Sequence, residues 1–259
     1  MRILLLGDIC GRPGRRVLRD RLPQIRSDYG PDVVIANGEN AAGGFGLTAK
    51  VAEELFEMGV HVITGGNHLW DQKEMVSYIA QEPRILRPAN YPPGTPGNSL
   101  YFAPVNGQEV AVMSFIGRVF MGDFDCPFRR FDQLQRKAAE RTPFIVVDFH
   151  GEATSEKQAF GWFADGRASV VVGTHTHVPT SDQRVLPAGT AFTTDLGMCG
   201  PRDGILGVER DAIIKKFRSQ LPVRFTVAKG PMQLCGVFVV VDNAGRAESI
   251  KRIYLEAEE

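Results

Sequence analysis

Four of the five histidines of this chain lie in short polar segments, and each segment follows an apolar run typical of a buried strand. Two further segments of the same kind carry carboxylates or amides. The five segments span residues 7–11, 37–40, 66–68, 148–150 and 173–177. Because open α/β sheets bind ligands at the carboxyl ends of strands, we expect these side chains to meet at one edge of the fold. Imidazole nitrogens with carboxylate and amide oxygens suit divalent transition metals, so the pattern predicts a metal site.

Strand-like and helix-like patterns alternate along the first hundred residues. The expected elements are strands near residues 2–6, 33–36 and 61–64 and helices near residues 13–27 and 49–58. Thr48 can cap the second helix, whereas Pro23 predicts a kink or an early stop in the first. This alternation is typical of βαβ units and therefore of a parallel sheet.

Strands dominate the remainder of the chain, and helices are expected at residues 131–141, at 155–165 and within 208–220. The expected strands lie at residues 100–103, 109–115, 144–147, 170–172, 190–193, 224–227, 234–241 and 249–255. So many strands exceed what one flat sheet holds comfortably. The sequence therefore predicts an α/β fold of two packed mixed sheets flanked by helices, a four-layer α/β/β/α sandwich. No linker or composition shift interrupts residues 1–259, which favours a single domain.

The charge balance excludes some partners. Thirty basic and thirty acidic residues give a formal net charge of zero, so nucleic-acid binding is not expected.

No apolar run approaches membrane-spanning length, and the apolar residues after Met1 are too few for a signal peptide, which favours a cytoplasmic protein without membrane contact. The four cysteines lack C-x-x-C spacing and are expected to be reduced. The sequence leaves a homo-oligomer open.

Each candidate residue has an ordinary structural explanation when it is taken alone. An aspartate placed like Asp8 is more often a turn or cap residue, and a single histidine such as His150 more often has a structural role. His175 and His177 would project to one side if the backbone there were extended. The five segments nevertheless share one description, an apolar strand followed by a ligand-type residue and a turn, and coincidence would have to act five times. His61 lies within an apolar run without that setting, so we expect it to be structural.

The ordered motifs resemble those of the calcineurin-like metallophosphoesterase superfamily. That superfamily carries the series G-D-x-H-G, G-D, G-N-H, a single histidine and G-H-x-H, and this chain follows the same order along most of its length. It departs in three places: Cys10 replaces the first histidine, Glu39 replaces the bridging aspartate, and residues 173–175 replace the usual Gly-His start of the last motif. At these positions the chain resembles the motifs of the YmdB-like branch, and the later segment 194–198 resembles that branch as well.

The resemblance implies two metal ions, with iron or manganese expected, and hydrolysis of phosphodiesters that include 2′,3′-cyclic nucleotides. Mixed nitrogen and oxygen ligands do not themselves select one metal, and they also permit zinc. By resemblance to that branch, Asn40 serves as a metal ligand in place of the missing first histidine, so Cys10 is not required as a ligand. The implied ligands are Asp8, Asn40 and His177 for one metal, Asn67, His150 and His175 for the other, and Glu39 as the bridge.

The expected chemistry follows from two metals about 3.5–4 Å apart, which can share a water and lower its pKa toward neutrality. His68 is implied not to be a ligand, and it can act as the general acid on the leaving oxygen or make a hydrogen bond that supports a ligand. Asp148 and Asp195 lie near ligand segments and could orient imidazoles. The leading hypothesis is a phosphodiesterase acting on small nucleotides. The alternatives are a phosphomonoesterase or nucleotidase on the same site, and a nucleotide-sensing regulatory protein with a structural metal.

The rim of the pocket is expected from the loops near residues 41–47, 70–73 and 118–129. Phe120, Phe124 and Phe128 could stack a nucleobase, and packing or a subunit contact is an equal alternative for them.

Overall fold

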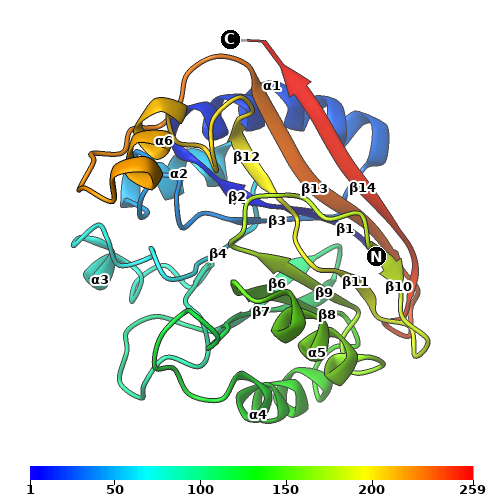
Figure 1. Cartoon of the computed structure of the whole chain (residues 1–259). Coiled ribbons are helices and arrows are strands. Elements are labelled where there is room, and N and C mark those ends of the chain that lie inside the picture. Colours follow the sequence, from blue (N-terminus) through cyan, green and yellow to red (C-terminus); the bar gives the residue numbers. More distant parts are fainter. Residues whose placement is uncertain (259) are drawn as a thin grey trace.

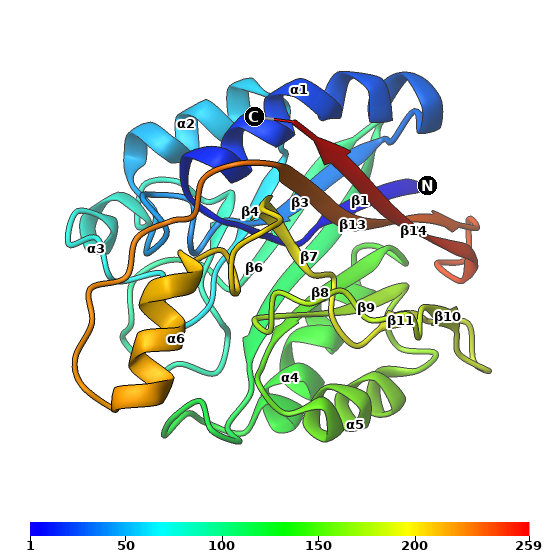
Figure 2. The same cartoon turned by 45° about the horizontal axis from the view of Figure 1, so that its top comes forward.

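Two mixed sheets packed face to face form the centre of the computed structural model, which describes residues 1–258 (Figure 1). Helices α1 (Gly11–Tyr29) and α2 (Ala49–Glu57) cover the outer face of one sheet. Helices α4 (Pro127–Ala139) and α5 (Thr154–Ala164) cover the outer face of the other, as the turned view in Figure 2 also shows. The expected α/β/β/α sandwich is confirmed.

The first sheet has the strand order β2-β12-β13-β1-β3-β4-β5, and β14 pairs with β13 outside that path. Strands β1, β3 and β4 are parallel neighbours, so their carboxyl ends lie at one edge. The members of this sheet are β1 (Arg2–Leu6), β2 (Asp8–Ile9), β3 (Val33–Asn37), β4 (Val62–Thr64), β5 (Ile85–Leu86), β12 (Met198–Pro201), β13 (Met232–Val241) and β14 (Ala247–Ala257).

The second sheet has the order β10-β11-β9-β8-β7-β6. Its strands β7, β8 and β9 are parallel, and their register places His150 at the end of β8 opposite Thr174 at the end of β9. The members of this sheet are β6 (Leu100–Val105), β7 (Gln108–Ile116), β8 (Ile145–His150), β9 (Val170–Thr174), β10 (Arg184–Val185) and β11 (Ala191–Thr193).

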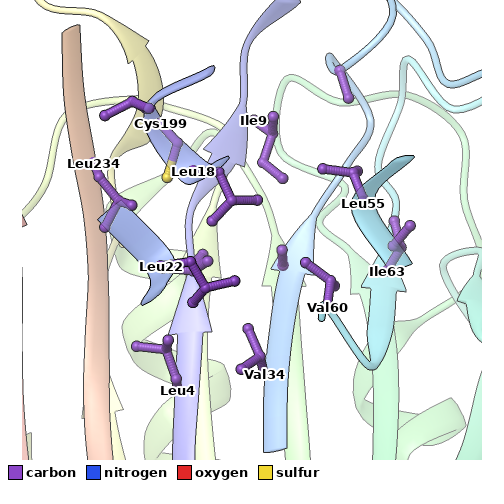
Figure 3. Packing of buried hydrophobic residues seen from close by; sticks show 14 of the residues in the cluster. Leu4, Ile9, Leu18, Leu22, Val34, Leu55, Val60, Ile63, Cys199 and Leu234 are labelled. Carbon is purple, nitrogen blue, oxygen red and sulfur yellow. The ribbon is translucent and has the colours of Figure 1, made fainter. Parts of the chain in front are cut away.

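Alternation along β1 shows how the core is divided. Ile3 and Leu5 pack between the two sheets, whereas Leu4 and Leu6 face the helix layer. Successive side chains of a strand point to opposite faces, so a fully apolar strand fills two clusters at once. Figure 3 shows Leu22 of α1 near Leu4 of β1, with Leu18 farther along the strand toward Cys199. A third cluster, rich in phenylalanine, lies under α4 and α5.

Two sequence predictions need correction. Helix α1 does not stop early at Pro23 but runs through it to Tyr29, because Leu22 and Ile25 remain buried against the sheet and tertiary packing outweighs the proline. Residues 224–227 form no strand, and only Val227 makes an isolated bridge, to Val208. Five short elements were not predicted from the sequence: β2, β5, β10, β12 and helix α3 (Met75–Tyr78). These elements have two to four residues, too few to show periodicity.

Helix α6 (Arg210–Ser219) falls within the expected range. Among residues 1–258 no helix combines the length and the apolar character that crossing a membrane requires.

Phe160 provides a test of the third cluster. Its ring centroid lies 4.5 Å from that of Phe149 and 5.4 Å from those of Phe115 and Phe131. Phe160→Ala should lower the free energy of unfolding by about 3–5 kcal/mol, measured by chemical denaturation, because a cavity replaces the ring. The control is Phe217→Ala, since Phe217 is 73% exposed, and it should change that free energy by no more than about 0.5 kcal/mol. Equal effects of the two substitutions would contradict the packing described.

Candidate metal centre

The carboxyl ends of strands from both sheets bring the predicted ligand residues together. Asp8 begins β2, Glu39 and Asn40 follow β3, and Asn67 follows β4. From the second sheet, His150 ends β8, while His175 and His177 follow β9. Asp8, Glu39, Asn40 and His150 are buried, and the other three are half-buried. Each of the seven lies within 4 Å of at least one other through side-chain polar atoms.

One group of donors surrounds the Nε2 atom of His150. This atom lies 2.9 Å from Asn67 Oδ1, 3.0 Å from His175 Nδ1 and 3.3 Å from Glu39 Oε1. Glu39, His150 and His175 each offer one ligand atom, and the three atoms lie within 4.8 Å of one another. These donors could hold a metal ion.

A second group adjoins the first through Glu39. Asn40 Nδ2 lies 3.0 Å from Glu39 Oε1 and 3.4 Å from His177 Nε2, and Asp8 Oδ1 lies 3.9 Å from the same histidine nitrogen. Asp8 Oδ1 and Asn40 Oδ1 are both buried without a hydrogen-bond partner. Buried oxygens are costly in that condition, and a bound cation would satisfy them. The residues present therefore fit a metal at this position too.

All three histidines present one nitrogen to the cluster and bond the other nitrogen elsewhere. His150 Nδ1 lies 2.9 Å from Thr174 Oγ1, and His175 Nε2 lies 3.2 Å from Glu152 Oε2. His177 Nδ1 donates to the carbonyl oxygen of Leu206 at 3.0 Å. Metal-binding histidines usually have such partners, which fix the ring and the tautomer. The arrangement leaves three nitrogens free to bind a metal ion: Nε2 of His150, Nε2 of His177 and Nδ1 of His175.

The buried carboxylates and imidazoles strongly shift one another's pKa values. Burial disfavours a charge on Glu39, but the positive charge and hydrogen bond of His150 outweigh it and lower the pKa of Glu39 to about 2. Burial likewise disfavours a charge on His150, yet Glu39 and Asp8 raise its pKa to about 9. The pKa of His175 falls to about 3 through burial and the charge of His150. Because a metal competes with a proton for imidazole, metal binding here would release a proton.

The loop that carries His175 and His177 is not extended. Strand β9 ends at Thr174, and the two histidines have left-handed backbone angles, with φ of 101° and 63°. Such conformations of a residue other than glycine cost of order 1–3 kcal/mol and persist only where neighbours hold them. An extended backbone, the condition for a shared direction of the two side chains, is therefore absent here, although both rings reach the cluster.

Asp195 holds this loop between the two histidines. Its Oδ2 atom accepts hydrogen bonds from the backbone nitrogen of Thr176 at 3.2 Å, from the Thr176 hydroxyl at 2.7 Å and from Lys157 Nζ at 2.6 Å. Lys157 and Asp195 are 1% exposed. A Cβ at Gly173 would lie 1.8 Å from the carbonyl oxygen of Thr194, so only glycine fits where the loop begins. Asp195 thus acts on the histidines through the backbone rather than through an imidazole.

Asp148 acts on His150 through Thr174. Its Oδ1 atom accepts a hydrogen bond from the Thr174 hydroxyl at 2.7 Å, and that hydroxyl lies 2.9 Å from His150 Nδ1. Thr64 and Asn37 donate to the other carboxylate oxygen. Burial raises the pKa of Asp148, and these hydrogen bonds oppose the rise.

Sequence reasoning missed Lys157, Thr174 and Glu152. A signal existed for Lys157, which occupies the apolar stripe of α5 together with Phe160, Gly161 and Ala164. A lysine in such a stripe usually has a buried acidic partner.

His68 lies beside the cluster and is held from three directions. Its backbone nitrogen donates to Glu39 Oε2 at 3.0 Å, and its Nδ1 lies 2.8 Å from Asp71 Oδ2. Its ring packs edge-on against Phe45, with centroids 5.3 Å apart. Asp71 was also missed, although its spacing of three residues from His68 was visible in the sequence.

A cavity of about 490 Å³ opens beside Glu39, Asn40, His68, His175 and His177. Gly44 and Phe45 line it, which confirms the rim expected from residues 41–47. Residues 70–73 and 118–129 do not line it, and the opposite wall comes instead from residues 205–227.

Three further groups of residues named in the sequence analysis are the phenylalanines of residues 118–129, His61 and Cys10. Phe124 packs on Tyr91, and Phe128 packs on Phe160, so neither borders the cavity. His61 Nδ1 accepts a hydrogen bond from the backbone of Val34, a structural role as expected. Cys10 does line the cavity, and burial, with the nearby charge of Asp8, raises the pKa of its thiol to about 12.

The comparisons with known proteins agree with this geometry. A protein-family model described as "YmdB-like protein" matches residues 4–253 of this chain. The 2′,3′-cyclic-nucleotide 2′-phosphodiesterase of Bacillus subtilis is 52% identical over 256 residues, which cover 98% of this chain and 97% of that protein.

Two solved structures are similar along nearly their whole length. A hypothetical protein from Thermus thermophilus has a TM-score of 0.93 at 41% identity, with 99% of each chain covered. A phosphatase from Mycoplasma pneumoniae has a TM-score of 0.94 at 34% identity, with 100% of this chain and 94% of that chain covered.

The sandwich and the donor cluster at its strand ends define an enzyme of the metallophosphoesterase class, as expected from the sequence motifs. Within that class, the chain belongs to the YmdB-like family.

Lys157 provides a test of the support behind the histidine loop. Lys157→Met leaves Asp195 buried without its cationic partner, so the free energy of unfolding should fall by about 3–5 kcal/mol in chemical denaturation. The matched control is Lys137→Met on the exposed face of α4, which should change that free energy by no more than about 0.5 kcal/mol. Indistinguishable stabilities of the two variants would show that the buried ion pair does not support the fold.

Proposed function

We propose that this protein is a metal-dependent phosphodiesterase that hydrolyses small phosphodiesters such as 2′,3′-cyclic nucleotides. The observation that carries the proposal is the cluster of seven donor residues, with two unpaired buried oxygens on Asp8 and Asn40, at the side of a cavity of about 490 Å³. The activity named for the Bacillus subtilis relative, at 52% identity, supports the choice of substrate.

The donor set suits two ions that share Glu39. In this proposal Asp8, Asn40 and His177 hold one ion, while Asn67, His150 and His175 hold the other. Iron or manganese is proposed because the family resemblance implies them. When bound, such a pair of ions supplies a water of lowered pKa and neutralises charge on the phosphate oxygens. Gly66 is part of this fit, since a Cβ there would lie 2.3 Å from both Glu39 Oε2 and His150 Nε2.

His68 is the proposed proton donor. Its Nδ1 faces the carboxylate of Asp71, which fixes the ring and leaves Nε2 as the nitrogen that can give up a proton. Hydrolysis of a cyclic diester forms one P–O bond from water and breaks one P–O bond to a ribose oxygen. His68 Nε2 gives its proton to that leaving oxygen, and the product is a nucleoside monophosphate. Asp71 acts through His68 and is a positioning residue.

Glu39→Gln tests the shared ligand. The substitution keeps the side-chain shape but removes the bridging negative charge, so kcat/KM for 2′,3′-cyclic AMP should fall by at least about 100-fold. Metal analysis of the purified protein should show fewer ions per chain, with an unchanged circular dichroism spectrum. Glu53→Gln on the exposed side of α2 is the matched control. Full activity of Glu39→Gln with cyclic AMP would overturn the two-ion proposal.

The ester class is tested by comparing substrates on the wild-type protein. Faster hydrolysis of 2′,3′-cyclic AMP than of 3′-AMP at matched concentration supports a phosphodiesterase. The reverse order would favour a phosphomonoesterase, the class suggested by the name of the Mycoplasma pneumoniae phosphatase. Tight nucleotide binding without turnover of either substrate by fully metal-loaded protein would instead support a sensor.

His68→Asn tests the proton donor through the leaving group. A ribose oxygen needs a proton as it leaves, so kcat for 2′,3′-cyclic AMP should fall by about 10²–10⁴-fold. Hydrolysis of bis(p-nitrophenyl) phosphate should fall far less, because p-nitrophenolate leaves without protonation. Asp71→Asn should show the same leaving-group pattern with a smaller loss. Equal losses on the two substrates would mean that His68 serves another purpose.

A further inference from the structure

The cavity beside the metal cluster has two unlike halves. One half is lined by four of the seven donor residues and by His68; the four are Glu39, Asn40, His175 and His177. The other half is apolar, and we call it the apolar wall; it comprises Phe45, Ile205, Leu206, Ile213, Phe217 and Phe225. Apart from Phe45, this wall comes from α6 and the segments on either side of it. In Figures 1 and 2, α6 and the loop that follows it project from the sandwich.

Helix α6 is not held by a core. None of its residues is buried, and Phe217 is 73% exposed. The segments on either side of α6 are joined to each other by hydrogen bonds, in which Glu209 N donates to Thr226 O at 3.0 Å and Ala228 N donates to Gly207 O at 2.9 Å. Apolar side chains this exposed on one side of a cavity gain free energy when a ligand covers them. Packing within the described chain leaves Leu206 49% and Phe217 73% exposed.

The apolar wall is joined directly to the cluster. The carbonyl oxygen of Leu206 accepts the hydrogen bond of His177 Nδ1 at 3.0 Å, and the ring of Phe45 packs against that of His68. A group bound at the wall therefore lies next to the proposed ligands and proton donor. In a cyclic nucleotide the phosphate and the base are attached to the same ribose ring. A phosphate placed at the cluster leaves the base within this cavity, where the wall is the apolar surface that it meets.

We propose that the apolar wall is a nucleobase subsite, with Phe217 as its main contact, and that it determines preference for base-bearing substrates. The proposal rests on the phosphodiesterase function proposed above. The half-buried Lys216 and the exposed Gln220 also line the cavity and can meet polar edges of a base. Aromatic faces stack on any base, so purine and pyrimidine nucleotides should both be accepted.

The test compares two cyclic phosphates that differ only in the base: 2′,3′-cyclic AMP and 1-O-methyl-ribose 2′,3′-cyclic phosphate. Wild-type protein should prefer the nucleotide in kcat/KM. Phe217→Ala should reduce that preference roughly tenfold, chiefly through KM for the nucleotide, because stacking contributes to ground-state binding. Phe217→Tyr should retain it. The matched control is Phe120→Ala, since Phe120 is 89% exposed and does not line the cavity.

Binding of adenosine gives a second measurement that does not depend on hydrolysis. Adenosine has the base but no phosphate, and calorimetry should show binding to wild type that weakens roughly tenfold in Phe217→Ala. An unchanged substrate preference and unchanged adenosine binding in that variant would overturn the subsite while leaving the phosphodiesterase proposal intact. If wild type hydrolyses neither phosphate yet binds adenosine through Phe217, the function fails and the subsite stands.

The competing occupant of the wall is a second copy of this chain. Light scattering of wild type and Phe217→Ala distinguishes it. A change in oligomeric state with no change in substrate preference would assign the wall to a subunit contact and overturn the proposal.

Discussion

Burial of the Glu39 carboxylate is the constraint on which the site depends. A fully buried carboxylate is tolerated only where donors or cations surround it. Here Asn40, His150 and the backbone of His68 contact its two oxygens, and these partners come from three different strand ends in two sheets. The parallel arrangement of β1, β3 and β4 in one sheet and of β8 and β9 in the other makes this convergence geometrically possible. The site is therefore a property of the sandwich as a whole.

A layer of buried polar side chains stands behind the donors. Asp148 reaches His150 through a threonine hydroxyl, and Asp195 with Lys157 fixes the backbone between His175 and His177. Both sets of hydrogen bonds hold the imidazoles in place without occupying the nitrogens that face the cluster. Such buried polar groups are expensive to desolvate, so they add little net stability. Their value lies in fixing the direction of the rings, which a metal site requires.

The sequence predicted what depends on local pattern. Apolar runs such as residues 2–6 marked the strands, and the polar residue after each run marked the site, because strand ends of a parallel sheet share one edge. The backbone of His175 and His177 was not predictable in this way. Its left-handed turns depend on Asp195, which lies far along the chain and meets Thr176 only in the folded state. The apolar wall was missed for a related reason. Ile213 and Phe217 have helical spacing in the sequence, but nothing in that spacing shows that the helix lies beside the strand ends.

Under the proposed function, the two halves of the cavity explain how a chain without net charge would select a charged substrate. The phosphate needs only the local positive charge that the proposed ions bring to Asp8 and Glu39, so no basic surface is required. In the proposed subsite the uncharged base meets an apolar surface instead, to which α6 contributes Ile213 and Phe217, and none of the residues of α6 is buried in the core. Segments with few buried contacts have low local stability and can adjust around a ligand. The proposal therefore assigns the chemistry to the strand ends and the recognition of the base to a helix with few buried contacts, two different parts of the same fold.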